Sequence, residues 1–230
     1  MIDKVVKRIT YEDTKPFLLK KHYAHRMPSI SYAYGLFIND TLRGVCTFGM
    51  PASHSLCIGV CGVDYSSYVL ELNRLYLDDE ISEKYKDITS WFVSQSMQSL
   101  RLDFGNCIIV SYADSGMNHI GYIYQALSFT YTGKTRQRTD FYTGKNKHSR
   151  HYDKNAEQIY RSIRTSKYRY VKFVGSKTFK KYARRSLLWK VEEYPKGNRP
   201  MERYAVGDIE PKFVKIINTN EIITEDEVRQ

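Results

Sequence analysis

The stretch from Asn106 to Gly133 constrains the fold more than any other part of the chain. It opens with an apolar run, Cys107–Val110, whose length and β-branched content are typical of a fully buried strand. A polar turn follows, and apolar side chains then recur at the spacing of one helical face before a second short apolar run. The stretch therefore predicts a strand, a polar turn, a helix of two to three turns and another strand.

The polar turn in this unit contains a candidate site residue, Asp114. In open α/β sheets, ligands bind at the carboxyl ends of strands, and Asp114 follows the buried run at such an end. An aspartate here can equally cap the helix that follows. Both interpretations stay open at the level of the sequence.

The rest of the chain predicts helices and strands in a regular order. Residue patterns and turn signals favour a helix from Thr10 to about His22, a hairpin of Ile30–Asn39 and Leu42–Met50, a strand over Tyr68–Leu77 and a helix from Ile88 to about Leu102. Pro51–Ser67 has no periodicity and is expected to be a loop, whereas Ser186–Val191 predicts a last strand of the sheet and Phe213–Ile217 an edge strand. This order predicts an α/β fold with a mixed, mostly antiparallel sheet flanked by helices.

Two charged residues interrupt the apolar strand over Tyr68–Leu77. Strict alternation places Glu71 on one face and Arg74 on the other. A charge inside an apolar strand must be paired or must face a cavity. The two residues are therefore either part of a site or a structural ion pair.

The segment His22-Tyr23-Ala24-His25-Arg26 is the densest group of titratable residues in the amino-terminal half. Imidazole titrates near neutrality, so His22 can act as a base, an acid or a metal ligand. His22 and His25 are also candidate metal ligands as a pair, although two ligands alone are a weak metal signal. A histidine at a helix end can instead do no more than interact with the helix dipole.

The positive charge of the chain is concentrated in one segment. The net charge of the chain is +11, and Lys134–Lys190 contains 18 lysines and arginines against three acidic residues. Aromatic residues are interleaved with these cations: Tyr142, Tyr152, Tyr160, Tyr168, Tyr170, Phe173, Phe179 and Tyr182. Cations bind phosphates and rings can stack on exposed bases, so the segment predicts a nucleic-acid partner, with a solvated basic face as the alternative.

Cysteine usage and hydropathy bear on the compartment. The four cysteines are sparse for a disulfide scaffold and are expected to be reduced thiols. No apolar run approaches the roughly 18 to 20 residues that a membrane-spanning helix needs. The expected location is the cytoplasm, with no membrane partner.

Several of these residues, taken together and in this order, resemble the Mom family of bacteriophage DNA-modification proteins. The resemblance lies in His22-Tyr23-x-His25-Arg26 with Pro28, the Gly35–Gly49 hairpin, Glu71-Leu-Asn-Arg74-Leu, and Ser111-Tyr-Ala-Asp114 followed by His119-x-Gly121-x-Ile-Tyr124-Gln125-Ala126. It covers roughly residues 15 to 135 well and the remainder loosely. The family resembles the GNAT acyltransferase fold, which agrees with the order of elements above.

The resemblance implies a function and a set of site residues. It implies that adenine N6 in DNA is converted to a carbamoylmethyl (glycinamide) derivative that protects phage DNA from host restriction, with acetyl-CoA as carbon source and iron as a helper. The implied catalytic residues are His22, Tyr23, Arg74, Asp114 and Tyr124, and residues of second rank are Glu71, Ser111, His119 and Gln125.

A division of the chain follows from the resemblance together with the charge pattern. Residues 1–133 would form a GNAT-like catalytic core, 134–186 a basic aromatic DNA-binding insertion, and 187–230 the strands that complete the core and a tail. The partner would be double-stranded DNA, whether the protein acts as a homodimer stays open, and the expected phosphate contacts are Arg136, Arg138, Lys145, Lys147, Arg150 and Arg161.

One departure concerns the cofactor. Acetyltransferases of this fold bind pyrophosphate on a Gly-rich loop before a helix, whereas the corresponding segment here, Asp78–Asp87, has no glycine and five acidic residues. Two other functions remain: an acyltransferase that acts on RNA or a protein amine, and a DNA-binding protein without catalysis.

Overall fold

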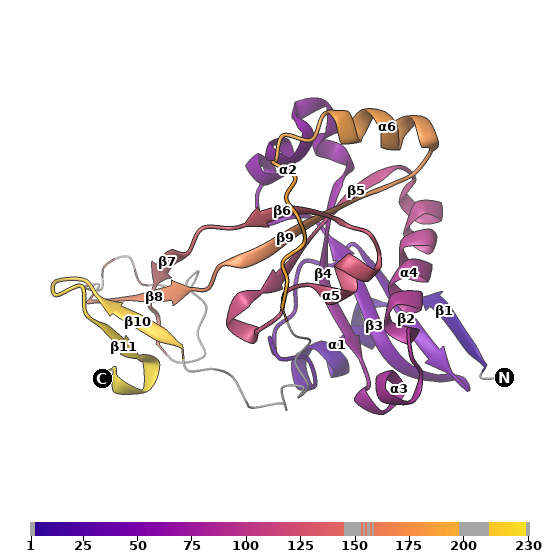
Figure 1. Cartoon of the computed structure of the whole chain (residues 1–230). Helices are drawn as coiled ribbons and strands as arrows, with labels where there is room; N and C mark the ends of the chain where they lie inside the picture. The colour runs from indigo at the N-terminus through magenta and orange to yellow at the C-terminus, as the bar shows by residue number, and fades with distance from the viewer. Residues whose placement is uncertain are drawn as a thin grey trace.

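Two β-sheets organise the chain in the computed structural model, which describes residues 3–144, 153, 155, 157, 159–197 and 212–228. The larger sheet has seven strands in the order β1-β2-β3-β4-β5-β9-β6, and the smaller has four in the order β11-β10-β8-β7 (Figure 1). The strands of the larger sheet are β1 (Lys4–Arg8), β2 (Tyr32–Ile38), β3 (Thr41–Gly49), β4 (Val69–Leu77), β5 (Cys107–Asp114), β6 (Thr130–Lys134) and β9 (Lys167–Val174). Those of the smaller sheet are β7 (Arg138–Phe141), β8 (Tyr160–Arg164), β10 (Phe213–Ile216) and β11 (Ile222–Thr224).

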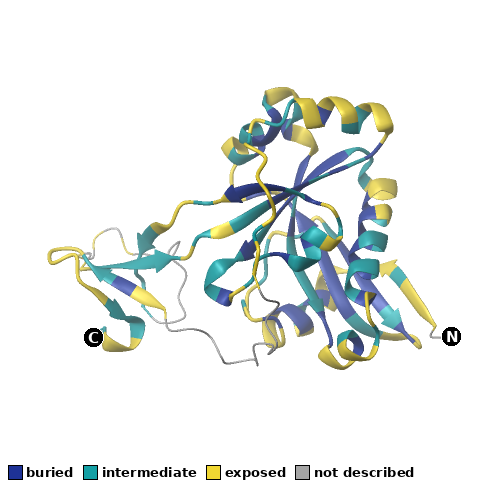
Figure 2. Cartoon of the chain, in the orientation of Figure 1, coloured by how far each residue is buried: buried dark blue, intermediate teal, exposed yellow. Residues whose placement is uncertain are grey.

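The larger sheet confirms the predicted fold class. Its neighbouring strands pair antiparallel, except β4 and β5, which pair parallel. Its central strands are buried on both faces, whereas the smaller sheet is mostly half-buried or exposed (Figure 2). The protein is therefore an α/β structure in which a mixed, mostly antiparallel sheet carries the core.

Helices cover both faces of the larger sheet. They are α1 (Tyr11–Lys20), α2 (His54–Cys61), α3 (Asp79–Lys84), α4 (Ile88–Phe104), α5 (Tyr122–Ala126) and α6 (Lys177–Arg185), with short 3-10 turns η1 (Val63–Tyr68), η2 (Ser115–Met117) and η4 (Glu225–Glu227). One apolar cluster packs α4 and α5 on the sheet through Phe92 and Tyr124. A second cluster packs α2 and α6 through Cys57 and Ala183. None of the helices in the described ranges has both the length and the hydropathy to cross a bilayer.

The predicted starts and turns hold where local chemistry is strong. Thr10 and Asp13 form a reciprocal capping box at the start of α1, as the predicted helix start at Thr10 requires. The hairpin of β2 and β3 turns at Asn39 and Asp40, which both have positive φ. The helix predicted after the polar turn is shorter than expected, because β5 extends to Asp114 and α5 has only five residues.

Two sequence predictions about local structure are wrong. The expected loop Pro51–Ser67 contains α2 and η1; α2 is apolar on most sides, so it lacks the polar face that would reveal a helix. The predicted strand Ser186–Val191 is not a strand: the segment does not pair along any strand of the sheet. Its backbone contacts are isolated: Leu188 N–H donates to Val60 O at 2.9 Å, and Glu192 N–H donates to Tyr131 O at 3.1 Å.

The predicted division at residues 134 and 187 also differs from the sheet order. β9 and α6 belong to the segment 134–186, yet β9 lies inside the seven-stranded sheet between β5 and β6. Of the described strands after residue 187, β10 pairs with β8 and β11 pairs with β10, so both belong to the smaller sheet and do not complete the core. Between β6 and β9 the chain leaves the larger sheet to form β7 and β8, and it returns with β9, which pairs with both β5 and β6.

Candidate active site

A pocket opens where the two parallel strands of the sheet separate. β4 and β5 pair only over Val69–Glu71 and Ile108–Val110, although β4 continues to Leu77 and β5 to Asp114. The pocket has a volume of ≈ 300 Å³ and is lined by both strands, the turn after α1 and the segment leading into α5. Its lining residues are His22, Tyr23, Glu71, Leu72, Asn73, Arg74, Leu75, Tyr112, Ala113, His119, Ile120, Gly121, Tyr122, Ile123, Tyr124 and Lys167.

A β-bulge at Asn73 brings Glu71 and Arg74 to the same pocket. Thr47 pairs with Arg74 and Phe48 with Leu72, so Asn73 has no partner in the register. Asn73 Oδ1 accepts a hydrogen bond from Thr47 Oγ1 at 2.6 Å, and its Nδ2 donates to Ser29 O at 2.7 Å. Strict alternation predicted the two charges on opposite faces of the strand. This prediction is wrong, because the extra residue at the bulge changes the face on which the following side chains lie.

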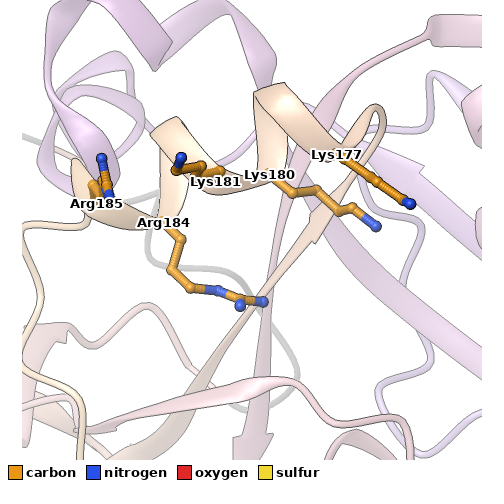
Figure 3. Close-up of a pocket in the computed structure, with 5 residues that line it drawn as sticks. All are labelled: Lys177, Lys180, Lys181, Arg184 and Arg185. Atoms are coloured by element: carbon orange, nitrogen blue, oxygen red, sulfur yellow. The ribbon is translucent and has the colours of Figure 1, made fainter.

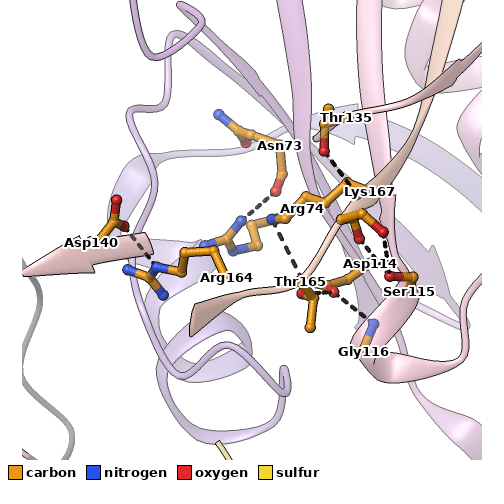
Figure 4. Close-up of polar contacts among 11 residues, drawn as sticks. Asn73, Arg74, Asp114, Ser115, Gly116, Thr135, Asp140, Arg164, Thr165 and Lys167 are labelled. Atoms are coloured by element: carbon orange, nitrogen blue, oxygen red, sulfur yellow. Dashed lines mark hydrogen bonds and ion pairs between the residues drawn. The ribbon is translucent and has the colours of Figure 1, made fainter. Parts of the chain in front are cut away.

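Arg74 presents an unused donor to the pocket. Its Nη1 donates to Asn73 O at 2.6 Å, while its buried Nε has no hydrogen-bond partner among the described residues (Figure 4). Burial lowers the pKa of Arg74, against the opposite effects of Tyr23 and Glu71. A buried donor without a partner costs about 1–3 kcal/mol. A carbonyl, carboxylate or phosphate oxygen of a ligand would remove that cost.

His22 is a neutral hydrogen-bond donor in the same pocket. Only 6% of the residue is exposed, and its Nδ1 accepts a hydrogen bond from Ala24 N–H at 3.0 Å. Burial, together with the positive charge of Arg74, lowers the pKa of His22 to about 3. Since Nδ1 is an acceptor, the single proton of the neutral ring lies on Nε2. The ring stacks on Tyr23, with centroids 4.4 Å apart.

Glu71 and Lys167 complete the charges of the pocket. Burial raises the pKa of Glu71, while Lys167 and Arg74 oppose the shift. Burial also raises the pKa of Tyr112, which lines the same wall. No pattern in the sequence distinguishes Lys167 from the other cations among the 18 of the basic segment, or Tyr112 from its neighbours in the polar turn.

Asp114 lies beside the pocket and is not part of its lining. Its Oδ1 accepts hydrogen bonds from Gly116 N–H at 3.0 Å and from Thr165 Oγ1 at 2.5 Å, and its Oδ2 lies 3.6 Å from Lys167 Nζ (Figure 4). Of the two interpretations of Asp114, this is the cap, here of η2. The same carboxylate also orients Lys167, which does line the pocket.

The remaining predicted site residues fall into two groups. Tyr124 and His119 line the pocket; burial raises the pKa of Tyr124 and lowers the pKa of His119, and His119 meets Tyr23 edge-on at 6.0 Å. Ser111 and Gln125 do not line it. Ser111 Oγ donates to Leu72 O at 3.0 Å, and Gln125 Nε2 donates to Ile120 O at 3.3 Å, so both stabilise the walls from outside.

The predicted metal ligands do not form a metal centre. His22 uses Nδ1 for the Ala24 amide, and His25 is exposed with Nδ1 2.9 Å from Leu19 O. In the ranges that the structure describes, no group of three His, Cys, Asp or Glu residues could hold a metal ion. These residues therefore do not fit an iron site.

The acidic segment Asp78–Asp87 does not fit a pyrophosphate group. It forms α3 in place of an open loop, and Asp78 is held by Lys21 at 3.1 Å and Arg43 at 3.2 Å. The first turn of α4 begins after Asp87, whose side chain forms no capping hydrogen bond and adds a further negative charge. A CoA pyrophosphate would meet carboxylates here instead of free backbone amides.

The expected DNA contacts are only partly described. Arg138 and Arg161 lie on β7 and β8, and Arg136 is exposed in the link before β7. Arg161 Nε donates to Thr139 Oγ1 at 2.9 Å, and its guanidinium lies over the Phe141 ring at 4.8 Å. Lys145, Lys147 and Arg150 lie outside the described residues.

Solved structures with a similar fold are acetyltransferases. An N-acetyltransferase from Staphylococcus aureus Mu50 is 13% identical with a TM-score of 0.45, covering 74% of this chain and 98% of that chain. A polyamine N-acetyltransferase from Drosophila melanogaster is 14% identical with a TM-score of 0.47, covering 75% and 100%. At these values the likeness concerns the general arrangement of sheet and helices alone.

Comparison with known sequences gives one assignment. No curated protein sequence matches the chain. The model of the Mom protein family matches residues 3–196, which include every part of the chain that lines the pocket: the turn after α1, β4, β5, the segment leading into α5 with α5 itself, and the start of β9. The chain therefore belongs to the Mom protein family.

Proposed function

We propose that this protein is a transferase that converts the N6 amine of adenine in DNA to a carbamoylmethyl derivative, and that the modified base protects phage DNA from host restriction. The observation that carries the proposal is the combination in one pocket of the unpartnered Arg74 Nε, the neutral His22 and a carboxyl group, Glu71, with a raised pKa. Membership of the Mom protein family supports the choice of reaction.

The walls of the pocket suit a flat base. The stacked pair of His22 and Tyr23 forms one wall, and Tyr112, Tyr122 and Tyr124 add further rings. A volume of ≈ 300 Å³ is at the small end of ligand pockets, so a single base and a small transferred group would fill it. An adenine in duplex DNA must leave the stack to enter, at a cost of a few kcal/mol.

The charged groups can serve the chemistry at N6. The adenine amine is a poor nucleophile. When its nitrogen forms a bond to the methylene carbon of the transferred group, the bond from that carbon to its carrier breaks, the carrier leaves with the electron pair, and the nitrogen loses one proton. Glu71 is placed to accept that proton, since a carboxylate with a raised pKa is a stronger base near neutral pH. Arg74 Nε–H and His22 Nε2–H can donate to the oxygen of the transferred group, and neither needs to reorganise.

Acetyl-CoA is the carbon donor that the family resemblance suggests, and the acidic segment 78–87 does not supply a phosphate site for it. The proposal therefore assigns Glu71 to the adenine amine and Arg74 and His22 to the oxygen of the transferred group. These roles do not depend on the identity of the carbon donor.

The test is nucleoside analysis of DNA from cells that express the protein. Mass spectrometry should find deoxyadenosine with the added mass of a carbamoylmethyl group, and the amount should fall at least 100-fold in an Arg74→Gln variant, since a lost donor of this kind costs about 10²–10³ in rate. The matched control is Arg101→Gln, which removes an exposed arginine of α4 and should leave the yield unchanged.

Other outcomes would select the other functions. Ordinary DNA nucleosides beside modified RNA or modified protein amines would favour the acyltransferase alternative. Ordinary nucleosides in all fractions, from a folded protein that binds DNA, would make the chain a binding protein and would refute the proposal.

A further inference from the structure

Helix α6 carries a strongly basic surface and lies on the core, away from the smaller sheet (Figure 1). Five cations follow the i, i+3, i+4, i+7, i+8 spacing of one helical stripe and line an open hollow over the helix. Figure 3 shows these side chains, which we call the α6 basic face: Lys177, Lys180, Lys181, Arg184 and Arg185.

No described acidic group neutralises the α6 basic face. The segment Ser176–Lys190 contains no Asp or Glu. None of the ion pairs recorded between described residues involves a cation of this helix. The positive charge of α6 also affects the neighbouring strand β9: burial is the main cause that lowers the pKa of Lys172, and the charges of Arg184 and Lys180 lower it further.

The free protein gains nothing from this arrangement. Like charges four residues apart on a helix, such as Lys177 with Lys181 and Lys181 with Arg185, repel each other and oppose helix formation. A polyanion that lies along the stripe would attract all of these cations and so offset their mutual repulsion. The charge pattern therefore fits a phosphate backbone, which offers repeated negative charges along a line.

The helix beneath the cations is firmly fixed. Ser176 Oγ accepts a hydrogen bond from Phe179 N–H at 3.1 Å and caps the first turn. Phe179 packs against Tyr65 and Tyr68, and the buried Ala183 accepts a hydrogen bond from Cys61 Sγ on α2. The helix that carries the α6 basic face is thus a platform that is already held in place before a ligand binds.

Strand β9 links this platform to the pocket. Lys167 at its start lines the pocket, and α6 begins three residues after its end. Eight residues of strand span roughly 26 Å, which is less than one helical turn of duplex DNA, about 34 Å. Arg169 shares the strand face of Val171 and Phe173, which pack with α6, and its guanidinium donates to Thr132 and lies over the Trp189 ring.

We infer that the α6 basic face binds the phosphate backbone of duplex DNA to one side of the adenine that enters the pocket. The inference rests on the proposed function in taking DNA as the substrate. It makes α6 a contact that positions the duplex, in addition to the smaller sheet.

The experiment compares two triple variants of the full chain. Lys177→Gln/Lys181→Gln/Arg185→Gln removes three exposed cations of the face, and glutamine keeps the helix propensity. The control, Lys20→Gln/Lys84→Gln/Lys86→Gln, removes three exposed cations near the acidic segment. Binding to a duplex oligonucleotide is measured from 50 to 300 mM salt, with thermal melting of each protein without DNA.

The α6 variant should bind DNA at least tenfold more weakly at about 100 mM salt, and the slope of log K against log salt should shrink by about three. Its melting temperature should equal or exceed that of the unchanged protein, which separates lost contact from lost fold. An unchanged slope in the α6 variant, or an equal loss in the control, would overturn the inference while leaving the proposed function intact. Binding of the unchanged protein to phosphatidylserine vesicles and not to DNA would also overturn it. Absence of any modified nucleoside would count against the proposed function instead.

Discussion

At the scale of single residues, the pocket contains a hydrogen-bond donor that no described residue pairs with, and one carboxylate, Glu71. Arg74 Nε is a buried atom without a hydrogen-bond partner among the described residues, although Arg74 Nη1 donates to Asn73 O, and His22 is a buried residue whose Nδ1 accepts from the Ala24 amide. Glu71 is the carboxylate among the lining residues, and Asp114 holds Lys167 from outside the lining. A ligand oxygen would therefore meet fixed donors, and a ligand amine would meet one carboxylate.

The neutral state of His22 makes the stability of the protein depend on pH. Its pKa of about 3 in the folded protein lies below the ordinary value of 6.5, so the unfolded chain binds more protons between these values. The free energy of unfolding should therefore decrease as the pH falls from about 6.5 toward 3, with a limiting slope of about 1.4 kcal/mol per pH unit from this residue.

Chemical denaturation of His22→Asn at a series of pH values tests this. Asparagine keeps an acceptor for the Ala24 amide but cannot be protonated, so the slope should become smaller; His119, whose pKa is also lowered, should leave a residual slope. The control His54→Asn changes an exposed histidine of α2 and should keep the full slope. An unchanged slope in His22→Asn would show that His22 is not the buried neutral group.

At the scale of elements, the bulge in β4 and the approach of Ser29 to β3 shape the site together. Asn73 bonds Ser29 O and Thr47, and a carbon atom added at Gly49 would lie 1.8 Å from Ser29 O and 2.9 Å from Asn73 Nδ2. Gly49 therefore has no side chain because a loop backbone occupies that space. The same contact fixes the Asn73 amide that holds the bulge.

The pair Gly49→Ala and Gly59→Ala tests this packing. Gly49→Ala should lower the free energy of unfolding by about 1–3 kcal/mol, since backbone must move, and should reduce the modification yield by displacing Asn73. Gly59 lies inside α2, where an added carbon meets only Trp189 Nε1 at 3.9 Å, so Gly59→Ala should raise stability by about 0.5–1 kcal/mol. Urea denaturation of both variants measures the difference, and equal effects would contradict it.

The elements that the sequence predicted correctly are those whose pattern is local. The helix start at Thr10, the first hairpin and the strand over Tyr68–Leu77 each depend on neighbouring residues, and the structure contains all three as α1, the β2–β3 hairpin and β4. The bulge at Asn73 was not predictable, because it depends on hydrogen bonds to Thr47 and Ser29, which lie 26 and 44 residues away.

The site shows the same limit. His22, Tyr23, Glu71, Arg74, His119 and Tyr124 were selected from the sequence, and the structure brings all six to one pocket. Lys167 was missed because it lies on β9. The sequence analysis assigned this strand to a basic insertion, whereas β9 belongs to the larger sheet. Asp114 was selected as a catalytic residue, and its carboxylate caps η2 beside the pocket; a capping carboxylate and a catalytic carboxylate cannot be told apart in a sequence, because their partners are not known.

At the scale of the whole molecule, two links that the structure describes in full join the smaller sheet to the core: the link from β6 to β7 and the turn between β8 and β9 (Figure 1). Asp114 at the end of β5 contacts both Thr165 and Lys167 of the β8–β9 turn, and Ser115 Oγ donates to Ser166 O at 2.7 Å. This cluster fixes the direction in which the smaller sheet leaves the pocket. Asp114 would then affect the reaction through the position of Lys167 and of the smaller sheet.

Hydrogen exchange in Asp114→Ala and Asp114→Asn distinguishes this role from direct chemistry. Alanine removes the acceptor for Gly116 and Thr165 and the charge near Lys167, so backbone amides of β7 and β8 should exchange faster while those of β2 and β3 stay unchanged. Asparagine keeps one acceptor oxygen, so it should give a smaller change in exchange and should retain part of the modification yield. Complete loss of modification in Asp114→Asn, with exchange unchanged in both variants, would instead make Asp114 a group that acts on the adenine itself, because only its charge would then matter.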